Sequence, residues 1–216
     1  IDIMEAVLQR GHTLLVLTNA MQPMMRPRVQ EGLTRLQAEF GPQITMRVSL
    51  DHYTAEKHDE ERGAGSFELS QKGIHWLGVK GFNIAIAGRT MWHEAEADAR
   101  VGYDGMLKAL GVELDVNDPT ALVLFPEMEE QADPPEITIS CWGILNKDPA
   151  DIMCASQRMV VRRKGASSAT VLACTLIPYD DAFEMGVTLE EARRDVPLNH
   201  PFCASFCVLG GGSCSA

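Results

Sequence analysis

The sequence predicts an α/β fold, in which a parallel sheet is covered by helices, followed by a small cysteine-rich α+β extension. Two observations lead to this prediction. Short apolar runs of strand length alternate with segments of helical periodicity through the first 128 residues. All six cysteines of the chain lie at or beyond position 141. We therefore expect two domains, at residues 1–128 and 129–216.

The chain begins with the pattern of a helix followed by a buried strand. Apolar residues at positions 1, 4, 7 and 8 lie on one helical face, and Gly11 stands where that helix would end. The run 13–18 (TLLVLT) is continuously apolar, which is typical of a strand buried on both faces of a parallel sheet. The next helix is expected over residues 28–40, ended by Gly41 and Pro42.

The cycle of strand and helix then repeats. The second, third and fourth strands are expected at 44–50 (ITMRVSL), 82–87 (FNIAIA) and 121–125 (ALVLF). Helices are expected from Ser66, acting as the N-terminal cap, to about Lys80, and from Glu94 to Leu110. Strands joined by helices of this length form right-handed βαβ units. The sequence therefore predicts an all-parallel sheet, in a full or partial barrel or an open α/β fold.

Polar side chains follow the ends of the predicted strands, where parallel α/β folds bind their ligands. Asn19 follows the first strand, Ser49 and Asp51 lie at the end of the second, and Arg89 follows the third. The first three could hydrogen-bond ribose hydroxyls or an amino-acid head group, and Arg89 could hold a carboxylate bidentately. Asn19 and Asp51 could equally cap turns. Position alone leaves both interpretations open.

The cysteines are candidate metal ligands: Cys141, Cys154, Cys174, Cys203, Cys207 and Cys214. The last three have the spacing C-x3-C-x6-C, and Cys154 and Cys174 bracket an expected β-hairpin with Gly165 in its turn. Thiolates on short loops can converge on a soft metal or an iron–sulfur cluster. Disulfides are an alternative, but a chain of 216 residues does not need them to fold. A structural zinc site is another alternative, although the usual C-x2-C pairs are missing.

Charge and composition exclude several classes of function. The formal net charge of −11 argues against a nucleic-acid surface, because phosphate binding depends on Lys and Arg. No apolar stretch is long enough to predict a transmembrane helix. The G-x-G-x-x-G fingerprint of nicotinamide binding and the G-x-S-x-G elbow of hydrolases are both absent.

Two parts of the sequence resemble the radical S-adenosylmethionine (radical SAM) enzymes. In that superfamily a strand ending in S-x-D is followed by an H-D-x-x-R-G-x-G-S-F segment and a helix ending in Gly-Phe. Those places are filled here by His58, Asp59, Arg62, Gly63, Gly65, Ser66 and Phe67. The cysteine pattern is similar to the SPASM or twitch extension of the family, which holds auxiliary iron–sulfur clusters.

The resemblance implies a partial radical SAM (β/α) barrel over residues 1–128 and an auxiliary iron–sulfur domain over 129–216. It implies S-adenosylmethionine as a cofactor, cleaved to a 5′-deoxyadenosyl radical, and a [4Fe–4S] cluster bound by the cysteines. Asn19 and Ser49 would contact the ribose or methionine part of the cofactor, and Arg89 a carboxylate. The enzyme would be a cytoplasmic oxidoreductase or maturase. Its partners would be a small-molecule or peptide substrate and an electron donor such as flavodoxin or ferredoxin.

The sequence departs from the family in three ways. The C-x3-C-x2-C and Gly-Gly-Glu motifs of the family are missing from this sequence. In such enzymes both motifs lie N-terminal to the part of the chain that corresponds to Ile1. We therefore expect an N-terminally truncated fragment that does not generate the radical by itself. Eight residues separate Gly165 from Cys174, where the family usually has four. Six cysteines stand in place of seven, which leaves open one cluster or two. The catalytic residues are unknown. The alternatives are a non-catalytic, zinc-stabilised α/β binding domain and a hydrolase or lyase with structural thiols.

Overall fold

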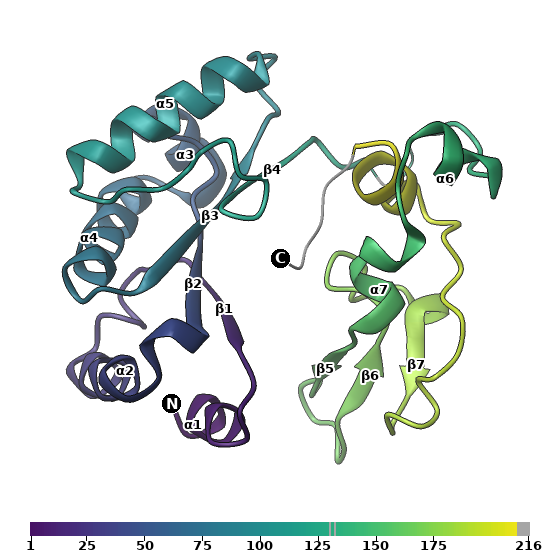
Figure 1. Cartoon of the computed structure of the whole chain (residues 1–216), viewed down its shortest axis with the longest axis horizontal. Coiled ribbons are helices and arrows are strands. Elements are labelled where there is room, and N and C mark those ends of the chain that lie inside the picture. Colours follow the sequence, from purple (N-terminus) through teal and green to yellow (C-terminus); the bar gives the residue numbers. More distant parts are fainter. Residues whose placement is uncertain (130, 132, 211–216) are drawn as a thin grey trace. The chain divides into compact units, whose positions relative to one another are not determined.

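The computed structural model describes residues 1–129, 131 and 133–210, and the chain divides into two compact units. We call Ile1–Phe125 the sheet unit and Pro126–Ala216 the cysteine unit. Figure 1 shows the elements of each. In the described part of the chain no helix has both the length and the apolar character needed to cross a membrane.

The sheet unit contains a four-stranded parallel sheet. Its strands are β1 (Leu14–Thr18), β2 (Ile44–Ser49), β3 (Asn83–Arg89) and β4 (Leu122–Phe125), and they neighbour one another in sequence order. The register pairs Leu14 with Ile44, Met46 with Ile84, and Ile86 with Leu122. The predicted α/β class and the all-parallel pairing of the four strands are confirmed.

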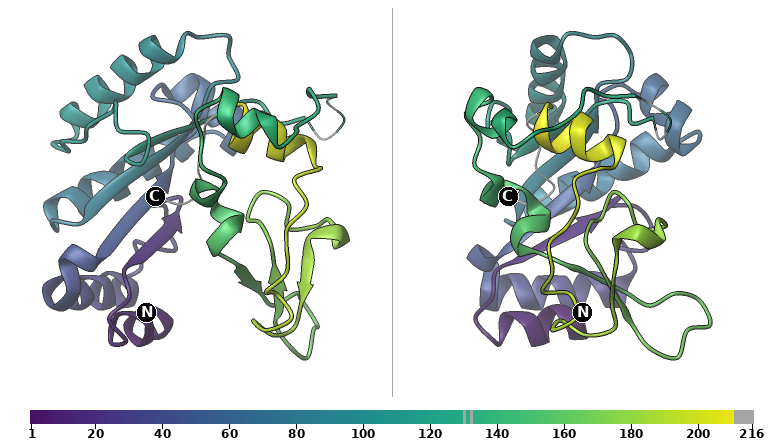
Figure 2. Two further views of the ribbon diagram at one scale, coloured as in Figure 1. Left: turned by 45° about the vertical axis from the view of Figure 1, so that its right-hand side comes forward. Right: turned by 90° about the vertical axis from the view of Figure 1, so that its right-hand side faces the viewer.

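Three helices cover one face of this sheet. They are α2 (Pro27–Phe40), α4 (Ser66–Val79) and α5 (Glu96–Ala109), while the shorter α1 (Asp2–Leu8) precedes β1. Figure 2 shows α2, α4 and α5 on the same side. A right-handed crossover between neighbouring strands places its helix on one given face, and consecutive crossovers repeat that placement. The 3-10 turn η1 (Gly41–Gln43) ends α2 where Gly41 and Pro42 predicted an end.

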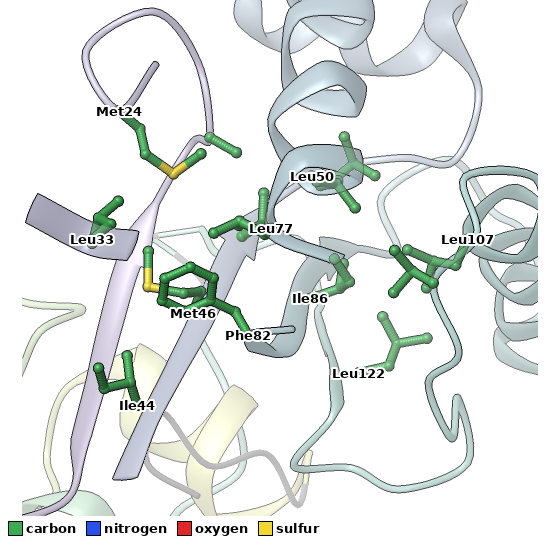
Figure 3. Close-up of a cluster of buried hydrophobic side chains, with 14 of the residues drawn as sticks. Met24, Leu33, Ile44, Met46, Leu50, Leu77, Phe82, Ile86, Leu107 and Leu122 are labelled. Carbon is green, nitrogen blue, oxygen red and sulfur yellow. The ribbon is translucent and has the colours of Figure 1, made fainter. Parts of the chain in front are cut away.

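The core lies between the sheet and these helices. Ile44, Met46 and Val48 alternate along β2 and are each at most 1% exposed, so this side of the strand faces the helices. The other residues of β2, which are Thr45, Arg47 and Ser49, therefore lie on the opposite face of the sheet. Figure 3 shows part of the core, with Leu33 of α2, Leu77 of α4 and Leu107 of α5 near the strand residues.

One helix of the sheet unit was not predicted. Helix α3 (Ala55–Arg62) has the sequence AEKHDEER, and His58 is its one buried residue. The helix therefore presents no apolar stripe, and periodicity is the signal by which a helix is normally recognised in a sequence.

The prediction that Ser66 caps α4 is wrong. Gly65 occupies the N-cap position, and the Asp59 carboxylate accepts hydrogen bonds from the N–H groups of Gly65 at 2.7 Å and Phe67 at 2.8 Å. Ser66 donates its hydroxyl proton to the same carboxylate at 3.0 Å. Gly63 and Gly65 have φ of 94° and 80°, which allows the loop to fold back so that Asp59 reaches the start of α4. The cap thus comes from the preceding helix.

Replacing Asp59 by Ala is expected to lower the thermal midpoint at neutral pH. The N–H groups of Phe67 and Gly65 hold the pKa of Asp59 below its ordinary value, so the fold favours the carboxylate over the acid. This stabilisation is present above the unfolded-state pKa of about 3.9 and is lost as the pH falls through the lower folded-state pKa. Thermal melts of both proteins between about pH 7 and pH 2 should show the gap closing in acid. An equal gap at every pH would contradict the assignment.

The cysteine unit is built on a small antiparallel sheet. Strands β5 (Met159–Val161), β6 (Thr170–Leu172) and β7 (Glu184–Gly186) lie in that order, and Gly165, with φ of 82°, is in the turn between β5 and β6. The predicted hairpin is therefore confirmed. The other elements are α6 (Ser140–Ile144), α7 (Met153–Ser156), the 3-10 turns η2 (Pro149–Asp151) and η3 (Asp181–Phe183), and the π-helix η4 (Cys203–Val208). Strand β7 was not predicted, because three residues are too few to show a period.

Candidate functional site

Four of the cysteines line one small cavity in the cysteine unit: Cys154, Cys174, Cys203 and Cys207. Cys154 precedes the β5–β6 hairpin and Cys174 follows it. Because antiparallel strands return the chain to its starting point, the hairpin brings these two residues to the same end. Cys203 and Cys207 come from the π-helix η4, four residues apart. The remaining lining is entirely apolar: Ile152, Met153, Leu176, Ile177, Phe183, Val196, Leu198 and Phe202.

The surroundings of Cys154, Cys174 and Cys203 favour the protonated form of their thiols. Burial raises the pKa of Cys154 and of Cys174, and it raises the pKa of Cys203 to about 11. The proximity of Cys174 raises the pKa of Cys154 and of Cys203 further. The N–H of Leu176 donates to the Cys174 sulfur at 3.3 Å, a contact that stabilises negative charge on that sulfur. A bound cation reverses the preference for the thiol, because the thiolate is the ligand form.

The four thiols suit a thiophilic metal. The volume of the cavity distinguishes between a single ion and an iron–sulfur cluster. The cavity has a volume of about 20 Å³, which is space for one water-sized particle. A single ion fits this volume, whereas an iron–sulfur cube requires the cysteine-bearing segments to move apart. At their present separations, the described residues contain no group of three or more His, Cys, Asp or Glu side chains that could hold a metal ion.

The fifth cysteine that the structure describes, Cys141, is not part of this cavity. Cys141 lies in α6, where its sulfur accepts a hydrogen bond from the Thr138 N–H at 3.4 Å, and it does not line the cavity. Cys214 lies outside the described residues. Of the five cysteines that the structure describes, four therefore line the cavity, and the role of Cys214 as a ligand stays a prediction.

A wider groove adjoins the cysteine cavity. It measures about 590 Å³, a volume in the range of small-molecule sites, and Leu198 lines both spaces. The π-helix η4 contributes Ala204 to the groove and Cys203 and Cys207 to the cavity. The groove is lined by apolar side chains such as Trp142, together with acidic residues and His200.

The second candidate site is the carboxyl edge of the parallel sheet, where the structure places Asn19, Ser49, Asp51 and Arg89. The Asn19 side chain accepts a hydrogen bond from the Met21 N–H at 3.1 Å, so it caps the turn after β1. Ser49 ends β2 on the face away from the core helices, and its hydroxyl has no hydrogen-bond partner among the described residues.

The two charged residues at this edge are engaged by α3. The buried carboxylate of Asp51 receives two hydrogen bonds from Arg62, at 2.5 and 2.9 Å. Arg89 forms an ion pair with Glu61 at 2.6 Å. A ligand at this edge would therefore have to share or replace these partners. The roles of Asn19, Ser49, Asp51 and Arg89 as ligand contacts stay predictions.

A polar cluster beside this edge was not found from the sequence. His52 is 1% exposed, and its Nε2 lies 3.0 Å from the Glu94 carboxylate, which also accepts a hydrogen bond from the Tyr53 hydroxyl. The hydrogen bond to Glu94 is the main cause that raises the pKa of Tyr53 to about 12. Burial lowers the pKa of His52, which keeps the ring neutral near neutral pH. Glu94 is 42 positions from His52 in the chain, so no local pattern links them.

Comparison with known proteins does not assign this chain to a family. A scan against protein-family models found no match, and a search of curated proteins found no match either. The residues of the cysteine cavity and of the sheet edge are therefore the basis on which a function can be assigned.

Proposed function

We propose that the chain is the C-terminal portion of a radical SAM oxidoreductase or maturase that carries an auxiliary iron–sulfur cluster in the cysteine cavity. The observation that carries this proposal is the convergence of Cys154, Cys174, Cys203 and Cys207 on one apolar cavity. Four thiols around one centre are the usual ligand set of an iron–sulfur cluster. The family-like segment from His58 to Phe67 supports the same assignment independently.

The topology of the sheet unit supports the proposal that this unit is part of a (β/α) barrel. In an open, doubly wound fold the strand order reverses and helices cover both faces of the sheet. In the sheet unit the strands follow one another in sequence order, and α2, α4 and α5 cover one face. Sequential order with helices on a single face is the arrangement of a (β/α) barrel. We therefore take the sheet unit as part of the radical SAM barrel.

In this proposal S-adenosylmethionine lies at the carboxyl edge of the sheet. The bound cofactor would supply a 5′-deoxyadenosyl radical, together with methionine, on accepting one electron from a cluster held by the family's C-x3-C-x2-C motif, which this sequence does not contain. The Ser49 hydroxyl, which has no partner among the described residues, would hydrogen-bond the ribose or methionine part, with Asn19 and Asp51 beside it. Arg89 would hold a carboxylate by exchanging it for Glu61. The enzyme would work in the cytoplasm with an electron donor such as flavodoxin or ferredoxin.

The residues around the cysteine cavity suit a redox role. Apolar walls exclude water from the cluster, and hydrogen bonds to its sulfurs tune the reduction potential. The Leu176 N–H is such a donor, to Cys174. A small-molecule or peptide substrate would reach the neighbourhood of the cluster through the adjoining groove.

A zinc-stabilised, non-catalytic α/β binding domain is the second candidate. The observation in its favour is the volume of the cavity, about 20 Å³, which has room for one ion and not for a cluster. Four thiolates in a tetrahedron are a common structural zinc site. In this case the cysteine unit would be a stabilised scaffold, and the groove would be its binding surface.

Metal analysis of protein purified without oxygen distinguishes the two candidates. The first predicts a brown protein with about four iron and four sulfide ions per chain after reconstitution. The second predicts a colourless protein with about one zinc ion per chain. Zinc alone, after reconstitution with iron and sulfide, would overturn the radical SAM proposal. A protein that takes up neither metal would overturn both.

A further inference from the structure

One carboxylate holds two consecutive residues of the turn that follows β2. An oxygen of Glu94 accepts the Nε2 proton of His52 at 3.0 Å, and the other oxygen accepts the hydroxyl proton of Tyr53. The proton of the imidazole is on Nε2 because Nδ1 accepts a hydrogen bond from the Thr54 N–H at 3.0 Å. Both oxygens of Glu94 and both nitrogens of His52 are thus engaged.

Further polar contacts join the same two segments. The Lys57 ammonium lies 4.0 Å from Glu94 and 5.7 Å from the centre of the Trp92 ring. The indole N–H of Trp92 donates to Glu60 at 3.3 Å, and Arg89 pairs with Glu61 at 2.6 Å. We call this set of contacts between residues 52–61 and residues 89–94 the rim clamp.

Helix α3 needs such contacts because it has almost no apolar packing. Its one buried residue is His58, so it lacks the apolar stripe that normally fixes a helix to a core. Hydrogen bonds to a charged carboxylate are stronger than those between neutral groups. Within the rim clamp, Glu94 is the residue that receives the largest number of these contacts.

We propose that Glu94 is a positioning residue that fixes the turn after β2, and with it α3, to the segment after β3. The ends of β2 and β3, which carry Ser49, Asp51 and Arg89, then form one rigid rim. This inference goes beyond the proposed function, because it holds whatever ligand the rim binds. It assigns to the Glu94 carboxylate the task of holding two neighbouring loops in one arrangement.

Hydrogen–deuterium exchange of the full chain tests the inference. Glu94→Ala should raise exchange about tenfold or more in both 52–62 and 89–95, while amides of β2 and α4 exchange as before. Glu94→Gln should restore most of the protection, since its amide oxygen can accept from His52 while its NH2 donates to the Tyr53 oxygen. Asp104→Ala is the control, because it removes an ion pair of α5 outside the rim clamp.

Three results would overturn the inference. The first is unchanged exchange in 52–62 for Glu94→Ala. The second is faster exchange throughout the sheet unit, which would mean a general loss of stability. The third is a Glu94→Gln protein that exchanges like Glu94→Ala.

If the alanine variant does not fold, Tyr53→Phe takes its place. It removes one of the two hydrogen bonds to Glu94 and should raise exchange in both segments to a smaller extent. No change in either segment would overturn the inference.

Discussion

Replacing Cys154, Cys174, Cys203 or Cys207 by alanine, one at a time, is expected to abolish assembly of the proposed iron–sulfur cluster. Iron content after reconstitution should fall from about four per chain to below about one in each variant. All four thiols line the same cavity, and the remaining lining residues are apolar. Among the described residues that line the cavity, therefore, none could replace a missing sulfur ligand.

Cys141→Ala is the matched control for these variants. It also removes one free thiol, but Cys141 does not line the cavity, so iron content and visible absorbance should equal those of the unaltered chain. Iron and sulfide assays, with absorption and electron paramagnetic resonance spectra, provide the measurements. If Cys141→Ala lost the cluster, or if two of the four cavity variants retained it, the proposed ligand set would be wrong.

Replacing Gly73 by alanine is expected to destabilise the sheet unit by about 2 kcal/mol. A Cβ atom at this position of α4 would lie 1.9 Å from the carbonyl oxygen of Ala20, which is fully buried in the turn after β1. Two effects oppose each other. Alanine favours the helix by about 1 kcal/mol over glycine. Overpacking against backbone costs about 1–3 kcal/mol or more, and it dominates because a carbonyl cannot rotate away as a flexible side chain can.

Gly105→Ala provides the comparison for Gly73→Ala. Gly105 is also inside a helix, α5, and a Cβ there would have no atom within 4 Å, so helix propensity alone should act. This variant should gain about 0.5–1 kcal/mol. Chemical denaturation gives both free energies of unfolding. Similar values for the two variants would show that the turn at Ala20 moves aside at little cost.

The sequence predicted those parts of the fold whose signals are local. The four parallel strands were found because continuous apolar runs are distinctive, and the β5–β6 hairpin because Gly165 marks its turn. Helix α3 was missed because its charged sequence has no apolar stripe. The cap of α4 was misassigned to Ser66 because the true acceptor, Asp59, is supplied by another helix across two glycines with positive φ.

The candidate site was predictable only as a set of residue types. Spacing pointed to the cysteines as a group, but it did not separate Cys141 from the four that share a cavity. That separation depends on the packing of the π-helix η4 against the hairpin, which no sequence window contains. The contact between His52 and Glu94 bridges 42 positions, and neither residue belongs to a recognisable motif. Contacts between distant segments are set by the tertiary fold rather than by periodicity.

The arrangement of the four cavity cysteines has a consequence for the life of the protein in the cell. A metal centre bound there would join the two ends of the hairpin to the π-helix, and so cross-link distant positions of the chain. Such a cross-link closes a loop that runs from Cys154 to Cys207. By analogy with disulfides, closing a loop of this length lowers the entropy of the unfolded chain enough to stabilise the fold by about 4 kcal/mol. That is a large share of the stability of a small domain. Proteases would then remove metal-free molecules first, so the supply of metal would set how much of this protein accumulates.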